Sequence, residues 1–390
     1  MEKQQKHIPQ LRFPEFQNDG EWEVKRLGEI ITVNSGRDYK HLNQGDIPVY
    51  GTGGYMLSVD DKLSDIDAIG IGRKGTIDKP QFLKAPFWTV DTLFFLTTKD
   101  GYDLNFVFFL FQTIEWKKYS EQTGVPSLTR NSIEKIEVKV PPLAEQRRIA
   151  ACLLALDEML SATKDKLEQL KAYKKGLMQK LFPAKGKTLP EYRFKEFEKD
   201  GEWKVMKLGE IITEVKDTTN DSVSIPLYSL TIDEGITAKN ERYERGFLVT
   251  KKDNVFKVVS PNDFVSNPMN LRLGAIGCNH NTFSVCVSGY YDVFRFKESG
   301  SSVFWINYLK SDLLLHKYDE IAIGSLIEKR RVYYSNLQNL SVLVPTIQEQ
   351  RKIADCLSLL DEIINAYAEK VVQLGQYKKG LMQQMFPTSK

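Results

Sequence analysis

An internal repeat constrains the fold of this 390-residue chain more than any other feature of its sequence. Residues 11–32 return 181 positions later as residues 192–213, with Asp-Gly-Glu-Trp and Leu-Gly-Glu-Ile-Ile-Thr in common. Residues 140–183 return 204 positions later as residues 344–387, and about 25 of these 44 positions are identical. The second copy therefore holds 204 − 181 = 23 extra residues between its conserved ends. We expect two units with similar ends and different middles.

The closing segment of each copy has the spacing of a coiled-coil helix. Between positions 149 and 181, Ile or Leu fills eight of ten positions spaced alternately by four and three residues, and residues 353–385 repeat this spacing. Such heptads predict two helices, each on the order of 50 Å long. A proline precedes each helix and a Phe-Pro pair ends it, which sets the expected boundaries.

Two arrangements of these helices are open. Each helix could pack only on its own globular domain, or the two could pair with each other. Two copies in one chain favour pairing, antiparallel and with pseudo-two-fold symmetry. Lys174 and Lys378 interrupt the apolar seam at equivalent places. Exposed lysine stems that cover the seam are the favoured interpretation, ahead of a contact with a partner protein.

The two middles combine strand and helix patterns. Residues 87–96 and 282–288 are predicted strands, and residues 104–119 and 302–317 are predicted short helices. The expected fold class is α+β, with two globular mixed α/β domains joined by the two long helices. The expected boundaries are 1–142 for the first domain, 143–183 for the central helix, 184–346 for the linker and second domain, and 347–390 for the C-terminal helix.

Composition limits the class of protein. The sequence has no run of about 18 apolar residues, and its polar N-terminal stretch does not resemble a signal peptide, so a cytoplasmic protein with no membrane partner is expected. The four cysteines form no Cys-x-x-Cys pair, and reduced thiols are expected. A net charge of +3 neither requires a polyanionic partner nor excludes one.

A glycine-rich stretch in the first middle, residues 70–75, matches the G-x-G-x-x-G pattern of dinucleotide-binding turns. A helix should follow such a turn, whereas residues 76–80 are typical of a strand and end in a proline, so nucleotide binding is disfavoured. A turn that presents Arg73 and Lys74, with Lys79 nearby, suits contacts with DNA phosphates or base edges. A solvated hairpin tip is the alternative.

The second middle contains Ser-Asn-Pro-Met-Asn at residues 266–270. This stretch resembles part of the loop that amino-methyltransferases place around a flipped adenine, but it lacks the second proline and the aromatic platform. Asn267, Asn270 and Arg272 suit base reading, since Asn pairs naturally with adenine and Arg with guanine. A purely structural turn is an equal alternative.

Basic residues with hydroxyl or aromatic neighbours close each middle. Thr129 and Arg130 close the first, and Lys329, Arg330 and Arg331, followed by two tyrosines, close the second. This mixture suits the wall of a DNA groove, and a solvated surface charge run is the competing interpretation.

The sequence predicts neither a catalytic centre nor a metal site. The histidines have no evident nucleophile or acid partner, so a catalytic triad is unsupported. The spacing of Cys278, His280 and Cys286 fits no common zinc pattern.

The helix motifs closely resemble those of one known family. Each long helix opens with Pro-x-x-x-Glu-Gln-Arg-x-Ile-Ala, at residues 141–150 and 345–354, and closes with Lys-Lys-Gly-Leu-Met-Gln and Phe-Pro. Together with two divergent middles, these motifs resemble the specificity subunit of type I restriction-modification systems over essentially the whole chain. The second middle resembles that family less plainly than the first.

The resemblance implies a non-catalytic reader of double-stranded DNA. Each target-recognition domain would bind one half of an asymmetric bipartite site, and the helices would set the spacer and dock two methyltransferase subunits. Two restriction-translocase subunits would join for cleavage. No cofactor is expected in this chain, because S-adenosylmethionine, ATP and Mg²⁺ would belong to the partners. The partner-binding candidates are Glu145, Gln146, Arg147, Glu349, Gln350 and Arg351.

Two other classes of protein stay open at this point. One is a coiled-coil scaffold without DNA specificity, and the other is a methyltransferase or nuclease with its own active site. For a DNA reader, the charge distribution matters: residues 1–142 carry 18 basic and 20 acidic residues, a net charge of −2. DNA affinity would therefore rest on local basic turns, and binding by the isolated chain should be weak and salt-sensitive.

Overall fold

The computed structural model describes residues 7–120, 124–238, 255–298, 300–326 and 330–387. The chain divides into two compact units, unit 1 with residues 1–165 and 368–390 and unit 2 with residues 166–367. Each unit contains one globular domain and parts of both long helices, α4 (Leu143–Leu181) and α9 (Ile347–Met385). Within the described ranges, no helix has the length and apolarity needed to cross a membrane.

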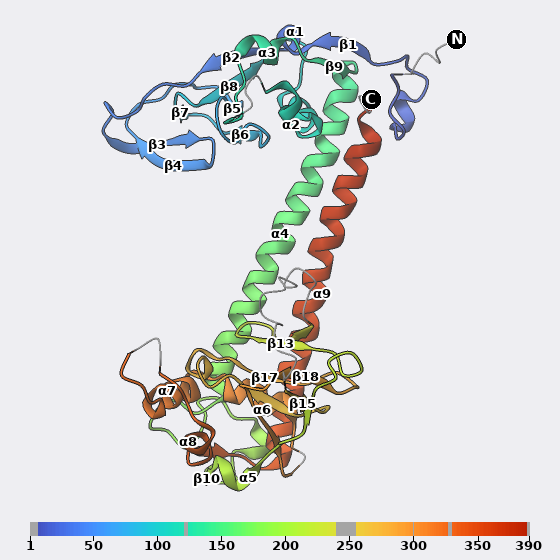
Figure 1. Ribbon diagram of the computed structural model, residues 1–390. Coiled ribbons are helices and arrows are strands. Elements are labelled where there is room, and N and C mark those ends of the chain that lie inside the picture. The colour runs from blue at the N-terminus through green and yellow to red at the C-terminus, as the bar shows by residue number, and fades with distance from the viewer. Residues whose placement is uncertain (1–6, 121–123, 239–254, 299, 327–329, 388–390) are drawn as a thin grey trace. The chain divides into compact units, whose positions relative to one another are not determined.

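The domain of unit 1 is built on a four-stranded antiparallel sheet (Figure 1). In chain order, its elements are β1 (Glu23–Arg26), α1 (Leu27–Ile30), β2 (Ile31–Ser35), β3 (Gln44–Gly51), β4 (Gly54–Val59), β5 (Ala68–Gly72), β6 (Gln81–Leu83), β7 (Trp88–Thr89), β8 (Leu93–Thr98), α2 (Leu104–Thr113), α3 (Arg130–Glu134) and β9 (Glu137–Val140). The main sheet has the order β2-β8-β5-β6, and the smaller sheets are β4-β3-β7 and β1-β9. Apolar residues of β2, β5 and β8 form one core with helix α2.

The domain of unit 2 repeats this plan with different lengths. Its elements are β10 (Lys204–Lys207), α5 (Leu208–Ile211), β11 (Ile212–Glu214), β12 (Thr218–Thr219), β13 (Tyr228–Thr231), β14 (Gly235–Ala238), β15 (Phe256–Val259), β16 (Phe264–Ser266), β17 (Ile276–Cys278), β18 (Val285–Ser288), β19 (Asp292–Phe296), α6 (Ser302–Leu309), α7 (Asp312–Ile321), α8 (Tyr334–Gln338) and β20 (Ser341–Val344). Its main sheet, β11-β19-β16-β17, has the same antiparallel topology as β2-β8-β5-β6. Strand β16 is therefore the counterpart of β5.

The repeated motifs of unit 1 meet where the domain joins the helices. The Glu145 carboxylate, at the start of α4, accepts two hydrogen bonds from Arg12, from Nε at 2.8 Å and from Nη2 at 2.7 Å, and one from Trp22 Nε1 at 3.3 Å. The side chains of Arg12 and Glu145 are only 5% and 1% exposed. The backbone N–H of Leu11 also donates to the carbonyl of Gln384 near the end of α9, at 2.9 Å. The conserved N-terminal segment thus ties the domain to both helices.

Unit 2 repeats these contacts one for one. The Glu349 carboxylate accepts hydrogen bonds from Arg193 Nε and Nη2, both at 2.8 Å, and from Trp203 Nε1 at 3.1 Å. The backbone N–H of Tyr192 donates to the Lys180 carbonyl at 2.9 Å. The sequence repeat is therefore a repeat of the joint between domain and helices.

The two long helices pair antiparallel inside each unit. In unit 1, Lys378 Nζ on α9 donates to both carboxylate oxygens of Asp157 on α4, at 2.6 and 2.7 Å. In unit 2, Lys174 on α4 makes the same fork with Asp361 on α9, at 2.6 and 2.8 Å. These half-buried interhelical ion pairs correct the interpretation of the two lysines as exposed stems. In each unit, both helices also pack on the globular domain. Helix pairing and packing on the domain are therefore both present.

The predicted fold class is confirmed, and some element boundaries differ. The predicted strand at 87–96 is broken, since the N–H of Leu93 bonds to the carbonyl of Val90 and turns the chain between β7 and β8. The predicted helix at 302–317 is two helices, α6 and α7, because the chain leaves helical geometry at Ser311, which lies between them.

Candidate functional site

In unit 1, the glycine-rich turn after β5 is exposed at its tip and constrained at its ends. A Cβ at Gly72 would lie 2.0 Å from the carbonyl oxygen of Thr76, and Gly75 has a φ of +90°, so both positions require glycine. Between them, Arg73 and Lys74 are exposed. The turn therefore holds two cations outward on a backbone with little freedom.

The backbone also joins this turn to the second predicted segment of the same domain. The N–H of Leu128 donates to the carbonyl of Arg73 at 2.9 Å. Thr129 then caps helix α3, because its hydroxyl accepts a hydrogen bond from the N–H of Ser132 at 3.1 Å, and Arg130 becomes the first helical residue. All the DNA-contact residues predicted in this domain are exposed: Arg73, Lys74, Lys79, Thr129 and Arg130.

In unit 2, the turn after β16 has the same place in its sheet as the turn after β5. The N–H of Val332 donates to the carbonyl of Pro268 at 2.9 Å, so the two predicted segments of the second middle also meet. The side-chain oxygen of Asn267 accepts a hydrogen bond from the N–H of Met269 at 3.1 Å and closes the turn. Asn270 is exposed. The sequence motifs thus converge at equivalent places in the two domains.

Two of the arginines predicted to contact DNA are engaged inside unit 2. Arg330 donates to the Asp319 carboxylate at 3.1 Å and to the Ala322 carbonyl at 3.2 Å. Arg272 forms an ion pair with the same carboxylate, with 3.6 Å between N and O. Both side chains are largely shielded, with 26% and 18% exposed. These contacts show that the Arg330 guanidinium holds the end of α7, and the DNA contacts of Arg330 and Arg272 stay predictions.

The remaining basic residues of this segment have different surroundings. The guanidinium carbon of Arg331 lies 5.7 Å from the centre of the Tyr290 ring, in a cation–π contact. An arginine stacked in this way still offers N–H donors at its edge. Lys329 lies outside the described residues. Arg331 therefore stays a candidate for DNA contact.

The Glu-Gln-Arg triplets at the helix starts divide into buried and exposed members. Glu145 and Gln146 are each 1% exposed. Gln146 accepts a hydrogen bond from the N–H of Asp103 and donates one to the carbonyl of Pro141, both at 2.9 Å. Their counterparts Glu349 and Gln350 are buried as well. This burial corrects the assignment of these four residues to partner binding: Glu145, Gln146 and Glu349 bond within the chain, and Gln350 Nε2 donates to the Pro345 carbonyl at 3.2 Å. The exposed members, Arg147 and Arg351, stay partner candidates.

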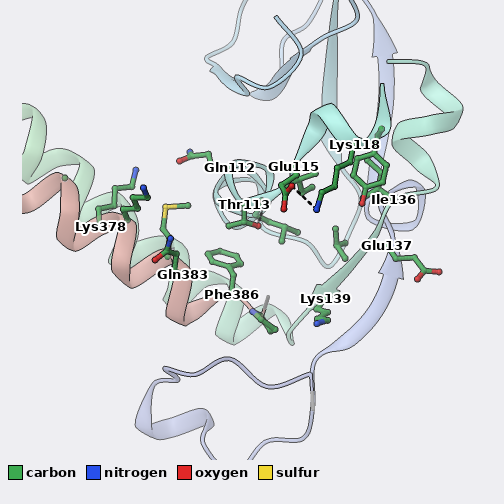
Figure 2. Close-up of a pocket in the computed structure, with 18 residues that line it drawn as sticks. Gln112, Thr113, Glu115, Lys118, Ile136, Glu137, Lys139, Lys378, Gln383 and Phe386 are labelled. Atoms are coloured by element: carbon green, nitrogen blue, oxygen red, sulfur yellow. Dashed lines mark hydrogen bonds and ion pairs between the residues drawn. The ribbon is translucent and has the colours of Figure 1, made fainter. Parts of the chain in front are cut away.

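A cavity of about 660 Å³ lies in unit 1 at the end of α9 (Figure 2). Figure 2 shows Lys378, Gln383 and Phe386 on the helix side and residues from the end of α2 and from β9 on the domain side. The helix wall belongs to the repeated Lys-Lys-Gly-Leu-Met-Gln and Phe-Pro motif.

Unit 2 has a cavity at the corresponding place, with a volume of about 330 Å³. Its helix wall includes Lys175, Met178 and Gln179, the counterparts of cavity residues in unit 1. Its domain wall comes from the end of the α6–α7 connection and the first turns of α7, which follow α6 as part of the other cavity wall follows α2. A hollow beside the end of each long helix is therefore a repeated feature.

Similar proteins point to one family. A family model described as the type I restriction modification DNA specificity domain matches residues 19–172. The putative type I restriction enzyme MjaX specificity subunit of Methanocaldococcus jannaschii is 24% identical over 320 residues, covering 78% of this chain and 71% of that protein. The MjaVIII specificity subunit of the same organism is 25% identical over 301 residues, covering 68% of this chain and 65% of that protein.

The fold has a solved counterpart. The crystal structure of a type I restriction-modification system S subunit from M. genitalium superposes with a TM-score of 0.64 at 16% identity and covers 98% of this chain and 100% of that one. The matched domain lies in the first half, and both units share its architecture. Residues 19–172 thus match the type I restriction modification DNA specificity domain, and over most of its length the chain is similar to type I specificity subunits in sequence and to a solved S subunit in fold.

Proposed function

We propose that this chain is the DNA-reading subunit of a type I restriction-modification assembly, in which each domain binds one half of an asymmetric bipartite site. The observation that carries the proposal is the contrast between joint and turn. The joint to the helices is the same in both units, down to the Arg12 and Arg193 forks. The turn at equivalent places of the two sheets is Gly-Arg-Lys-Gly in one domain and Asn-Pro-Met-Asn in the other. A joint shared by both domains, combined with different turns, suits domains that bind two different DNA sequences.

The chemistry of the tips supports DNA as the ligand. Arg73, Lys74 and Arg130 offer cations to phosphates or to guanine, and Asn270 offers an amide that suits adenine. Alanine at a phosphate contact should weaken binding about equally on all sequences and lower the salt dependence, whereas alanine at a base contact should relax one position of the site. Variants that leave affinity, salt dependence and site preference unchanged would remove these residues from the interface.

The helices would set the distance between the half-sites. The support is the pair of interhelical ion pairs, which repeat at an offset of 204 residues on both helices and so define one antiparallel register. Insertion of helical turns between Leu160 and Leu170, with matching insertions in α9, should lengthen the unspecified spacer of the methylated site. An unchanged spacer would count against this role.

Two methyltransferase subunits would dock at the repeated cavities, one at each. Two equivalent hollows suit two copies of one partner, and each is bordered by an exposed lysine of the helix motif, Lys175 or Lys379. Charge reversals at these lysines should lower the stoichiometry of the assembly one partner at a time. Two restriction-translocase subunits would complete a cytoplasmic complex, and the partners would bring S-adenosylmethionine, ATP and Mg²⁺.

One experiment tests the whole proposal. Cells receive this chain with its methyltransferase partner, and the methylated sites are sequenced. Replacing residues 192–343 by the corresponding segment of a related subunit should change one half of the site and leave the other half unaltered. Methylation without sequence preference would favour the scaffold alternative. Cleavage or methylation by the purified chain alone would favour an active site of its own.

A further inference from the structure

The two domains differ in chemistry at one matched place beside the DNA-facing turn. In unit 1, Ile71 on β5 lies opposite Phe94 on β8, and both belong to the apolar core. In unit 2, the corresponding cross-strand pair is Ser266 on β16 and Asp292 on β19. On the same face of β11, Glu214 stands where β2 has the buried Val33. A stretch that is apolar in one domain is thus polar in the other.

Asp292 is poorly satisfied where it lies. Burial raises its pKa to about 6 against the pull of Lys257, and Glu214 adds to the rise. Within the described ranges, no side chain or N–H group donates a hydrogen bond to its carboxylate, and no cation lies within ion-pair distance. A partly desolvated carboxylate without donors is costly, so such an arrangement is expected where a ligand supplies the donor.

A second polar group at this place also lacks a partner. Ser266 is 0% exposed, and its hydroxyl makes no hydrogen bond to any part of the chain that the structure describes. Because Ser266 and Asp292 are directly opposed on neighbouring strands, their side chains project from the same face, about 5 Å apart at Cβ. Tyr334 of α8 lies near this place, since its ring centre is 6.4 Å from that of Phe294, two residues along β19 from Asp292. The serine hydroxyl is thus placed to hold the carboxylate once a ligand orders it.

The position of this pair indicates what the ligand is. Ser266 is followed directly by Asn267, the first residue of the turn, and Tyr334 closely follows Val332, which is hydrogen-bonded to that turn. A carboxylate repels phosphate, so a backbone contact is excluded for Asp292. An ionised carboxylate only accepts hydrogen bonds, and in the major groove the donors are the amino groups N4 of cytosine and N6 of adenine.

We propose that Asp292, held by Ser266, accepts a hydrogen bond from the exocyclic amino group of a cytosine or adenine in the half-site read by the second domain. This inference rests on the proposed function and deepens it, because it assigns a chemical class of base to one domain. The first domain, apolar at the same place, makes no such contact.

The test uses the full chain assembled with its methyltransferase partner. In sequenced methylated sites, wild type should require C or A at one position of the second half-site. The base found there shows whether the donor is N4 of cytosine or N6 of adenine. Asp292→Asn, whose amide can also donate, should admit T or G at that position and leave the first half-site unchanged. Asp233→Asn, an exposed carboxylate of the same domain, is the matched control and should change neither half.

A second measurement covers the case in which Asp292→Asn fails to fold. Wild-type complex is titrated with a duplex in which the base at that position lacks its amino group, purine for adenine or 2-pyrimidinone for cytosine. Affinity should fall roughly tenfold. An unaltered site preference in a folded Asp292→Asn variant, or undiminished affinity for the modified duplex, overturns the inference while the proposed function stands. Loss of sequence preference in wild type itself would instead refute the proposed function.

Discussion

Glu145→Gln separates a structural role of the helix start from a role in partner binding. The substitution keeps the shape of the side chain and one acceptor oxygen but removes the charge that faces Arg12. Both side chains are almost completely buried, and hydrogen bonding to Glu145 is the main reason that the pKa of Arg12 is raised. The variant therefore leaves a buried guanidinium without its counter-ion.

The expected loss follows from the geometry. Removing one partner of a buried ion pair costs about 3–5 kcal/mol. The Nη1 group of Arg12 keeps two carbonyl acceptors, of Asp19 at 2.6 Å and of Gly20 at 3.0 Å, which favours the lower end, about 3 kcal/mol. For a unit of this size, each kcal/mol lowers Tm by about 2–4 °C, so we expect unit 1 to melt about 6–12 °C lower.

Hydrogen exchange with mass spectrometry on the full chain measures each unit separately. In Glu145→Gln, peptides of unit 1 should exchange faster while those of unit 2 stay protected. Glu349→Gln is the matched control and should give the reverse pattern, because Glu349 makes the same contacts in unit 2. Arg147→Ala, at an exposed neighbour, should change neither. If Glu145→Gln left exchange and melting unchanged but abolished assembly with the methyltransferase, the structural reasoning would be refuted.

Three further outcomes are expected. Lys174→Met leaves the half-buried Asp361 without its counter-ion and should destabilise unit 2 by about 1–2 kcal/mol in denaturant titrations. The charge exchange Lys174→Asp with Asp361→Lys should recover most of this loss. An equal loss in both variants would exclude a pairing role. The pKa of Asp292 is raised from 3.8 to about 6, with Lys257, Glu214 and Tyr334 as its charged or titratable neighbours, so its contribution to stability is present below pH 4 and is lost as pH rises through 6. Asp292→Asn should flatten this part of the stability profile of unit 2 and stabilise the unit at pH 7. An unchanged profile would show that Asp292 is well solvated. Gly72→Ala should distort the turn that carries Arg73 and relax the first half-site, unlike Gly124→Ala, whose Cβ meets nothing within 4 Å; identical methylated sites for the two variants would remove the turn from the interface.

Much of the architecture follows from local patterns. The heptads and the flanking prolines predicted the starts of both long helices, at residues 143 and 347, because spacing and helix-breaking residues act over short distances. The helices end at Leu181 and Met385, ahead of the expected 183 and 390. The repeated Asp-Gly-Glu-Trp and Glu-Gln-Arg motifs also predicted two similar units. Local patterns do not reveal the role of Glu145: the sequence predicts a partner contact, whereas its carboxylate accepts hydrogen bonds from Arg12, 133 residues away. Identity between the two copies was the signal that could have linked these motifs.

The candidate site divides in the same way. Residue type alone predicts the basic and amide-bearing turns, since glycine favours turns and arginine and asparagine carry groups that can contact DNA. Strand pairing and packing decide three other features. The turn after β5 meets the segment before α3, Asp319 engages Arg330, and Asp292 stands where the other domain has a core residue. The sequence by itself determined two copies, two helices and the polar character of the tips. Tertiary structure alone decided which charges are neutralised inside the chain and which stay exposed, because pairing of buried charges depends on distances between segments far apart in the chain.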